Sequence, residues 1–384
     1  MKKKILFVID TLTIGGANSS LSALYAEMKD FYDIKVFALT HDGDMSSHEF
    51  RDVLLPKDRL TDAYLGDYAK AFNKQKFFKS FVKVVKRLSV LLHINIEKKI
   101  YKRAANKIEL HNTFDSVVAF QENASAVFVS LLSCKNKTAW IHCDFTRGFP
   151  SSDAQIYHLF QKIVFVSHYT ELQFLIKFPQ YKGRTCFVYN FLDESRIERL
   201  SHEPVLDIAF SDNEFTVLSL GRIVPLKRFS KIPSIVAQIK TNGINLKWII
   251  LGPVFDVAEH KRLMDNIEKY DVRDNVFWLG GKSNPYPYMK KADLCVSLST
   301  TEACPMVFNE ARVLNVPIVT TDFGSAHEFV TDGVDGYIRP IDKISEVISD
   351  ICLDAEKYQN LHNNSVQKYI INNDIKLKLI SILN

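Results

Sequence analysis

The strongest constraint on the fold is a repeated alternation of short apolar runs with segments of helical spacing. The first run, Ile5–Ile9, is rich in branched side chains and bounded by polar residues, as expected for a strand buried in a parallel sheet. A loop containing Gly15-Gly16, helical spacing over Ala17–Lys29 and a second run, Ile34–Leu39, follow. This β-loop-α-β order predicts an α/β fold with a doubly wound sheet.

The same alternation occurs in two series of similar length. A polar interval, Asp193–Asn213, separates them, contains Pro204 and shows no strong apolar period. Such an interval predicts a domain boundary. The remaining expected strands are Ser116–Phe120, Thr138–His142, Lys162–Val166 and Thr185–Tyr189 before the interval, and Phe215–Leu220, Leu246–Leu251, Asn275–Leu279, Leu294–Leu298 and Pro317–Thr321 after it.

The pattern predicts two Rossmann-like domains in a chain of 384 residues. We expect the first domain to span residues 1–200 and the second to span residues 201–365. Residues 366–384 are expected to form a helix that packs back on the first domain, because Ile375–Leu383 has apolar helical spacing. Ligands of open parallel sheets bind at the carboxyl ends of the strands, so we expect a central ligand cleft faced by both sheets.

Composition narrows the class of protein. With 47% hydrophobic and 24% charged residues, the chain is expected to be globular. A formal net charge of +5 suits anionic ligands but does not favour nucleic acid as a partner. The 6 cysteines lack metal-ligand spacing, which predicts reduced thiols in a cytoplasmic protein without a metal site. The run Ile5–Ile9 is too short for a signal peptide, and no run is long enough to span a membrane.

Two features of the first series suggest a ligand site. Gly15-Gly16 would let backbone approach a ligand closely, and the helix that follows offers free N–H groups to phosphate. A simple tight turn is the alternative. His142 ends an expected strand and is placed to hydrogen-bond a reacting sugar, although a lone histidine is more often structural.

Two cations follow the first strand of the second series. Arg222 and Lys227 lie in the segment Gly221-Arg222-Ile223-Val224-Pro225-Leu226-Lys227, at the carboxyl end of that strand. Arginine binds phosphate through two hydrogen bonds and lysine acts as a point charge, so together they would neutralise a diphosphate without a metal. Solvated surface cations are the alternative.

Two glutamates eight residues apart flank a strand-loop-helix corner. Glu302 follows the expected strand Leu294–Leu298, and Glu310 lies in the first turns of the expected helix Met306–Leu314. Carboxylates accept hydrogen bonds from the paired hydroxyls of a ribose or hexose, and the loop between them can present N–H groups to phosphate. The alternative for Glu310, a first-turn charge favoured by the helix dipole, does not account for Glu302.

In order and spacing, these elements resemble the retaining GT-B glycosyltransferases of family 4, the glycosyl transferases group 1. His142 is similar to a histidine that follows a mid-domain strand in the family, and the turn Asp332–Gly336 resembles its late Asp-Gly-x-x-Gly turn. The main matches are the glycine pair Gly15-Gly16, the element Gly221, Arg222 and Lys227, and the pair Glu302 and Glu310, which fits the family's signature of two glutamates separated by seven residues.

The resemblance implies a role for each matched residue. Arg222 and Lys227 would bind the donor diphosphate, and Glu310 would bind the ribose hydroxyls. Glu302 would bind hydroxyls of the transferred sugar, and His142 would contact that sugar near the acceptor. We therefore predict His142 and Glu302 as catalytic residues. The predicted donor-binding residues are Gly15, Gly16, Arg222, Lys227, Cys304, Pro305, Met306, Val307 and Glu310.

The chain departs from the family at two points. Pro305 stands where many members have glycine, and proline supplies no N–H group to a phosphate. Met306 and Val307 are therefore the expected backbone donors. The segment Leu251-Gly252-Pro253 has fewer glycines than the usual loop of the family. The residues that form the pocket for the nucleotide base are therefore not predicted.

The implied activity is retaining, metal-independent transfer of a hexose or N-acetylhexosamine. The donor would be a nucleotide diphosphate sugar, with a UDP-sugar favoured and no further cofactor. The acceptor would be a glycan or a lipid-linked saccharide, in the synthesis of cell-surface polysaccharide or glycoconjugate. The alternatives are a sugar-nucleotide epimerase of the same architecture, a protein O-glycosyltransferase, and a binding module that has lost catalysis.

A basic, aromatic stretch spans Lys70–Arg103. Cations on one face of a helix and aromatic side chains on the other suit an anionic membrane surface, which would place the protein on the inner face of the cell membrane. A core-packing helix with a solvated cationic face is an equal alternative. The residues concerned are Lys74, Lys76, Lys79, Lys83, Lys86 and Arg87, interleaved with Phe77, Phe78 and Phe81.

Overall fold

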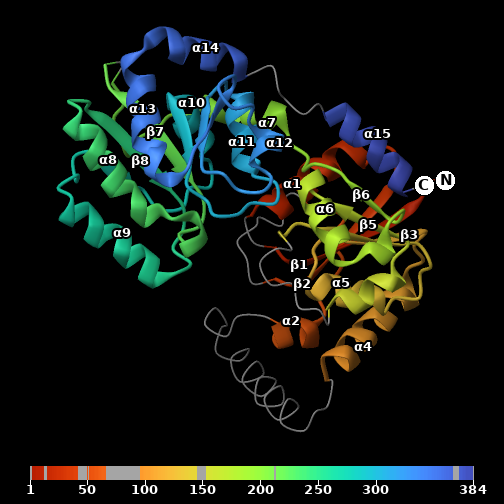
Figure 1. Ribbon diagram of the computed structural model, residues 1–384. Coiled ribbons are helices and arrows are strands. Elements are labelled where there is room, and N and C mark those ends of the chain that lie inside the picture. Colours follow the sequence, from red (N-terminus) through yellow and green to blue (C-terminus); the bar gives the residue numbers. More distant parts are fainter. Residues whose placement is uncertain are drawn as a thin grey trace. The chain divides into compact units, whose positions relative to one another are not determined.

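The computed structural model describes residues 2–12, 15–41, 50, 52–65, 96–144, 153–211, 213–365 and 372–383. It divides into two compact units (Figure 1). The first comprises Met1–Leu192 with Asn372–Asn384, and the second comprises Asp193–Ile371. Each unit contains a six-stranded sheet with helices between successive strands, which confirms the predicted α/β class.

The sheet of the first unit has the order β2-β1-β3-β4-β5-β6, and its strand pairs are parallel. Residues Ile5–Ile9 of β1 have no exposed surface, so helices cover both faces of this strand. The strands are β1 Lys4–Thr11, β2 Asp33–Thr40, β3 Ser116–Ala119, β4 Lys137–Ile141, β5 Lys162–Phe165 and β6 Thr185–Phe187; the helices are α1 Gly16–Met28, α2 Arg59–Leu65, α4 Ile96–His111, α5 Ala124–Ser130, η3 Asp153–Leu159, α6 His168–Lys177, η4 Pro179–Tyr181 and α15 Asn372–Leu383.

The sheet of the second unit has the order β12-β11-β10-β7-β8-β9, again with parallel pairs. Because β7 and β10 are neighbours, the loops that follow them start side by side at one edge of the sheet. The strands are β7 Phe215–Leu220, β8 Leu246–Leu251, β9 Val276–Trp278, β10 Leu294–Ser297, β11 Ile318–Thr320 and β12 Gly336–Ile338; the helices are α7 Glu194–Ser201, η5 Pro225–Lys227, η6 Phe229–Lys231, α8 Ile232–Thr241, α9 Val257–Lys269, α10 Tyr286–Lys290, α11 Met306–Val313, α12 Ala326–Phe329, η7 Ile341–Lys343, α13 Ile344–Leu353 and α14 Ala355–Ser365.

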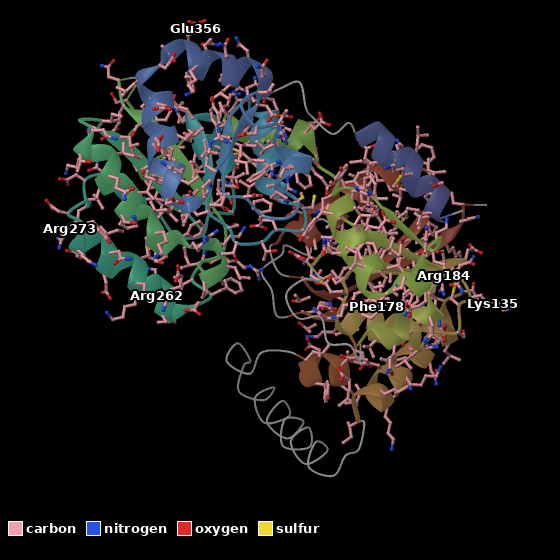
Figure 2. All side chains as sticks on the ribbon, in the orientation of Figure 1. Lys135, Phe178, Arg184, Arg262, Arg273 and Glu356 are labelled. Atoms are coloured by element: carbon pink, nitrogen blue, oxygen red, sulfur yellow. The ribbon has the colours of Figure 1, made fainter. Side chains whose placement is uncertain are left out.

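Each unit has an apolar core built from strand residues and the helices that cover them. In the first unit aromatic rings fill much of this core: Phe37 lies 5.3 Å from Phe128 between ring centroids. In the second unit the core is mainly aliphatic around the buried Trp248. Charged side chains such as Arg262, Arg273 and Glu356 lie at the periphery of the second unit (Figure 2). This division between apolar interior and charged surface is what the strand and helix periods of the sequence predict.

The units divide after Leu192, whereas the sequence interval suggests residue 200. The difference arises from α7, which packs against α10 and α11 of the second unit. Asp193 begins this helix, since its carboxylate accepts a hydrogen bond from the Arg196 N–H at 2.9 Å.

The C-terminal helix α15 belongs to the first unit. Lys376 Nζ on this helix donates to Glu27 Oε2 of α1 at 3.2 Å. From the other side, Lys162 Nζ of β5 donates to the Ser381 carbonyl at 2.7 Å. Apolar residues of α15, including Leu379, are buried. The helix therefore docks through apolar burial, with these polar contacts at its margins.

Most of the basic stretch Lys70–Arg103 lies outside the described residues. Only its last part, from Ile96, is described, as the start of α4. There Tyr101 is fully buried, and Arg103 pairs with Asp58 at 2.6 Å. Within the described part of the chain, no helix has both the length and the apolar character needed to cross a membrane.

Candidate functional site

An ion pair joins the carboxyl ends of β7 and β10 in the second unit. Lys227 Nζ lies 2.5 Å from Glu302 Oε1, and the two side chains are 23% and 18% exposed. Ser299 Oγ donates to the same carboxylate oxygen at 2.7 Å. The structure thus brings together two of the predicted site residues, because the strands that precede them are neighbours in the sheet.

The loop that carries Glu302 is fixed by side chains from neighbouring segments. Arg228 Nε donates to the Leu298 carbonyl at 2.6 Å, and Arg228 Nη2 donates to the Ser299 carbonyl at 3.0 Å. Ser325 Oγ donates to the Glu302 carbonyl at 2.7 Å. Arg228 has a φ of 53°, a left-handed conformation that is uncommon for a residue with a side chain. The sequence reading missed Arg228, although it directly follows the predicted Lys227.

Two glycines allow the chain to pass closely at the same edge. A Cβ atom on Gly252 would lie 1.7 Å from the Gly221 carbonyl oxygen, so a larger residue cannot fit without moving backbone. Gly221 has a φ of 143° and donates its N–H to the Leu251 carbonyl at 2.9 Å. A Cβ there would lie 3.1 Å from Lys227 Cε. The glycines therefore shape the backbone on which Lys227 sits.

Arg222 lies at the carboxyl end of β7 and is exposed. Its guanidinium lies 5.2 Å from the centroid of the Phe255 ring, which is itself 60% exposed. This cation–π contact holds the guanidinium at the surface with its N–H groups available to an anion.

In the part of the chain that the structure describes, no group of three or more His, Cys, Asp or Glu residues is placed to hold a metal ion.

Helix α11 starts within the predicted donor loop. Pro305 is its N-cap, with no side-chain hydrogen bond to the helix, and Cys304 before it is buried. The Phe308 N–H donates to the Pro305 carbonyl at 3.1 Å. Because a helix cannot satisfy its first N–H groups internally, those of Met306 and Val307 are the natural anion donors of this loop.

Glu310 is partly buried and lies beyond the first turn of α11, which contains no acidic residue. Tyr286 Oη donates to Glu310 Oε1 at 3.3 Å. Burial raises the pKa of Glu310 to about 7, while the hydrogen bond from Tyr286 lowers it. A carboxyl group placed here titrates in the neutral range, which a first-turn surface charge would not do. The sequence reading did not identify Tyr286.

The same helix carries a buried ion pair. Arg312 Nη2 lies 3.5 Å from Asp335 Oδ2, and the side chains are 1% and 2% exposed. Asp335 Oδ1 accepts the Thr331 N–H at 2.7 Å. The pair ties α11 to the turn Asp332–Gly336. It therefore fixes the helix that carries Glu310.

In the first unit, His142 directly follows β4. Its backbone N–H donates to Glu122 Oε2 at 3.0 Å, and its ring lies 4.8 Å from that of Phe120. Burial lowers the pKa of His142 to about 3, so the imidazole is neutral at physiological pH. The ring atom Nε2 is buried without a hydrogen-bond partner among the described residues. A neutral imidazole can donate or accept one hydrogen bond at that atom.

Two carboxyl groups near His142 were not predicted from the sequence. Asp10 is the penultimate residue of β1, and its Oδ1 accepts the Ser125 N–H at 2.7 Å. Glu122 follows β3, which lies between β1 and β4 in the sheet. Burial raises the pKa of both carboxyl groups, and the charge of Asp10 raises the pKa of Glu122 further. The sequence signal that could have identified Asp10 and Glu122 is that both follow apolar runs, Ile5–Ile9 and Ser116–Phe120.

The first glycine loop is described only from Gly15. Gly15 has an extended backbone, and a Cβ atom there would meet nothing within 4 Å. It is the N-cap of α1 but provides no side-chain cap for the helix N–H groups. The described structure therefore gives no internal steric reason for glycine at this position.

Comparison with known proteins assigns part of the chain to a family model. Residues 207–368 match the model of the glycosyl transferases group 1. The matched range contains the ion pair of Lys227 with Glu302, and Glu310 on α11. Residues 207–368 therefore carry a domain similar to the glycosyl transferases group 1. The match confirms the resemblance to the glycosyl transferases group 1 over this range.

Curated glycosyltransferases align with part of the chain. A glycosyltransferase of uncharacterised function from Methanocaldococcus jannaschii is 29% identical over 148 residues, which are 38% of this chain and 36% of that protein. The N-acetylgalactosamine-N,N'-diacetylbacillosaminyl-diphospho-undecaprenol 4-alpha-N-acetylgalactosaminyltransferase of Campylobacter jejuni is 26% identical over 183 residues, or 47% of each chain. The chain thus matches less than half the length of these curated relatives.

Solved structures match over nearly the whole chain. HepE from Anabaena in complex with UDP and glucose has a TM-score of 0.72 at 18% identity, covering 99% of this chain and 100% of that one. A mutant form of Staphylococcus aureus TarM has a TM-score of 0.71 at 15% identity, covering 100% of both chains. These likenesses establish the fold and confirm the predicted GT-B architecture.

Proposed function

We propose that this chain transfers a hexose or N-acetylhexosamine from a UDP-sugar to a glycan or lipid-linked saccharide, with retention of anomeric configuration. The observation that carries the proposal is the ion pair of Lys227 with Glu302 at the carboxyl ends of β7 and β10, followed by Glu310 on α11. A ligand at this edge of the second unit would meet a cation, two carboxyl groups and a helix N-terminus.

Positive charge at this edge would stabilise the departing nucleoside diphosphate. A lysine ammonium has three N–H donors, and Lys227 uses one on Glu302, so it can also meet a phosphate oxygen. Arg222 adds a guanidinium, and the N–H groups of Met306 and Val307 add the start of α11. Stabilising charge on a leaving group is commonly the largest catalytic term, and these groups would supply it without a metal ion or other cofactor.

Glu302 would hold the transferred sugar in place. One carboxylate oxygen is taken by Lys227 and Ser299, which leaves the other to accept hydrogen bonds from sugar hydroxyls. An ion-paired carboxylate is a weak nucleophile. We therefore assign Glu302 to sugar binding and to placing the reacting carbon, and not to the covalent step used by retaining glycosidases.

His142 would contact the transferred sugar as a neutral hydrogen-bonding group. Its low pKa keeps the imidazole uncharged, which suits a hydroxyl partner better than a phosphate. Gly15 and Gly16 would let the donor approach the start of α1 closely, which explains a glycine that nothing in the described structure requires.

The relatives suggest the class of acceptor. The Campylobacter relative acts on a diphospho-undecaprenol-linked saccharide, and a poly(glycerol-phosphate) alpha-glucosyltransferase of Bacillus subtilis is 28% identical over 148 residues. We propose an acceptor of this kind, in cell-surface polysaccharide or glycoconjugate synthesis in the cytoplasm. The stretch Lys70–Arg103 would bring the protein to the anionic inner face of the membrane.

The decisive experiment offers the purified chain a panel of nucleotide sugars with lipid-linked and soluble saccharide acceptors. We expect UDP release that depends on an acceptor, and a product whose new glycosidic bond keeps the anomeric configuration of the donor. Glu302→Ala should abolish the reaction. Epimerised donor without transfer would replace the proposal with the epimerase alternative, and transfer to a protein acceptor would favour a protein O-glycosyltransferase.

Membrane binding is tested separately by flotation with liposomes that contain or lack anionic lipid. We expect binding that requires anionic lipid and weakens with salt. Absence of binding at low salt would leave only the packing explanation for the basic stretch.

A further inference from the structure

Two tyrosines of the short helix α10 are used in different ways. Tyr286 begins the helix, and its Oη donates to Glu310 Oε1 at 3.3 Å. Tyr288 follows two residues later, and its Oη donates to Asp207 Oδ1 at 2.6 Å. Residues two apart on a helix do not share a face, so the first phenol contacts α11 and the second contacts the segment after α7. Only the first is linked to a candidate site residue.

Few ionisable groups surround Glu310. On β10, the thiol of Cys295 is buried, and the Glu310 charge contributes to raising its pKa to about 12. Burial and the Glu310 charge raise the pKa of the Tyr286 phenol most. Helix α7 packs against both α10 and α11; its Arg196 lowers that pKa, and its N-cap residue Asp193 raises it. Both Glu310 and Asp193 therefore favour the protonated phenol, and Tyr286 remains a hydrogen-bond donor throughout the neutral range.

We propose that Tyr286 is a positioning residue of the nucleotide site: by holding one carboxylate oxygen of Glu310, it directs the other toward a ribose hydroxyl of the donor. The inference rests on the proposed function together with the role for Glu310 that the sequence resemblance implies, which is binding of the donor ribose. A carboxylate turns freely about its last side-chain bond, and a fixed phenol donor removes that freedom before the ligand arrives.

The hydrogen bond also decides how Glu310 responds to pH. Burial raises the pKa of this carboxyl group to about 7, and the Tyr286 phenol opposes the rise because it donates to the charged form. A carboxylate accepts from both ribose hydroxyls, whereas a protonated carboxyl has lost an acceptor position. Nucleotide binding should therefore be strong above the pKa of Glu310 and weaken as the pH falls through it. Removal of the phenol oxygen should move that transition to higher pH.

The test compares Tyr286→Phe with Tyr288→Phe, a matched control on the same helix. Dissociation constants for UDP and for 2'-deoxy-UDP are measured calorimetrically between about pH 5.5 and pH 8.5, a range that brackets the pKa of Glu310. For the wild-type chain we expect binding of UDP to weaken below about pH 7 and to be several-fold tighter than that of the deoxy analogue. Tyr286→Phe should bind UDP about tenfold more weakly at neutral pH, move the transition upward and reduce the preference for UDP. Tyr288→Phe should match the wild type.

Superimposed pH profiles of Tyr286→Phe and the wild type would overturn the inference while leaving the proposed function intact. Equal shifts in the two variants would also overturn it, since they would show a general loosening of α10. Failure of the wild-type chain to bind any nucleoside diphosphate would refute the proposed function itself, and the role of Tyr286 with it.

Discussion

The predicted site residues of the two units are held in different ways. In the second unit, side chains bind side chains: Lys227 pairs with Glu302, and Tyr286 donates to Glu310. In the first unit, the backbone N–H of His142 meets Glu122, and burial rather than an ion pair sets the state of the ring. Side-chain pairs fix charge and geometry before a ligand binds. By contrast, Nε2 of His142 is buried and has no hydrogen-bond partner among the described residues, so it can still bind a ligand.

The contrast has a functional meaning under the proposed reaction. A diphosphate is a common feature of every nucleotide sugar, so the groups that bind it can be preorganised. The proposed partner of His142 is a hydroxyl of the transferred sugar, and a neutral hydrogen-bonding ring is a less demanding partner for a hydroxyl. The predictions below test this division, beginning with the variant expected to have the largest effect.

Glu302→Ala should lower the rate of sugar transfer by about a thousandfold or more, since it removes the sugar contact and leaves Lys227 without its partner. Lys227→Ala should have a comparable effect. Steady-state UDP release and a circular dichroism melt measure activity and folding together. Lys261→Ala, which breaks an exposed ion pair with Asp265 on α9, serves as a control and should be neutral. Turnover near the wild-type rate in the Glu302 variant would show that the site lies elsewhere.

Asp335→Ala should destabilise the second unit by about 3–5 kcal/mol, because Arg312 would remain as a buried charge without a counter-ion. Hydrogen exchange measured by mass spectrometry should accelerate in α11 and β12 and stay unchanged in β1 and β3. The double variant Arg312→Met with Asp335→Leu should recover much of the loss, as apolar replacements often do. Unchanged exchange in α11 would mean that the pair does not hold this helix.

His142→Ala should lower transfer by about a hundredfold while leaving the affinity for UDP close to that of the wild type. This separation of kcat from nucleotide binding distinguishes a residue that contacts the sugar from one that binds the diphosphate. Because the pKa of His142 lies at about 3, its protonation should contribute no change in rate between about pH 5 and pH 8. A rate that follows a histidine titration in that range would contradict the neutral imidazole.

Gly15→Ala should change folding stability by less than about 0.5 kcal/mol, because its Cβ atom would meet nothing and the backbone there is extended. Its effect should fall on catalysis, as a several-fold rise in KM for the donor. Gly252→Ala is the matched comparison in the second unit, and overlap with the Gly221 carbonyl should destabilise it by about 1–3 kcal/mol. Thermal melts and donor kinetics of both variants separate ligand approach from chain packing, and an unchanged KM for Gly15→Ala would remove this loop from the donor site.

Much of the fold could be predicted from the sequence. The branched run Ile5–Ile9 and its counterparts mark strands buried on both faces, and the helical spacing between them predicts a parallel sheet. Some short elements were not predicted: β12, Gly336–Ile338, is too short to show an apolar period in the sequence. The second unit begins at Asp193, at the start of the predicted boundary interval, because α7 packs on α10 and α11 through contacts that its own spacing does not reveal.

The residues of the candidate site likewise include some that the sequence predicted and some that it did not. Lys227, Glu302 and Glu310 were accessible to sequence reasoning because they follow apolar runs and belong to a spaced pattern. Their partners Arg228 and Tyr286 were not, since neither has a motif of its own.

What the sequence by itself determined is therefore the set of strands and the side chains that stand at their carboxyl ends. Only the tertiary structure decided which of those ends are neighbours. The order of the sheet places β10 beside β7 and brings Glu302 within 2.5 Å of Lys227, although 75 residues separate them along the chain. The physical reason is that periodicity reports which face of an element is buried, whereas an ion pair or hydrogen bond depends on which elements meet.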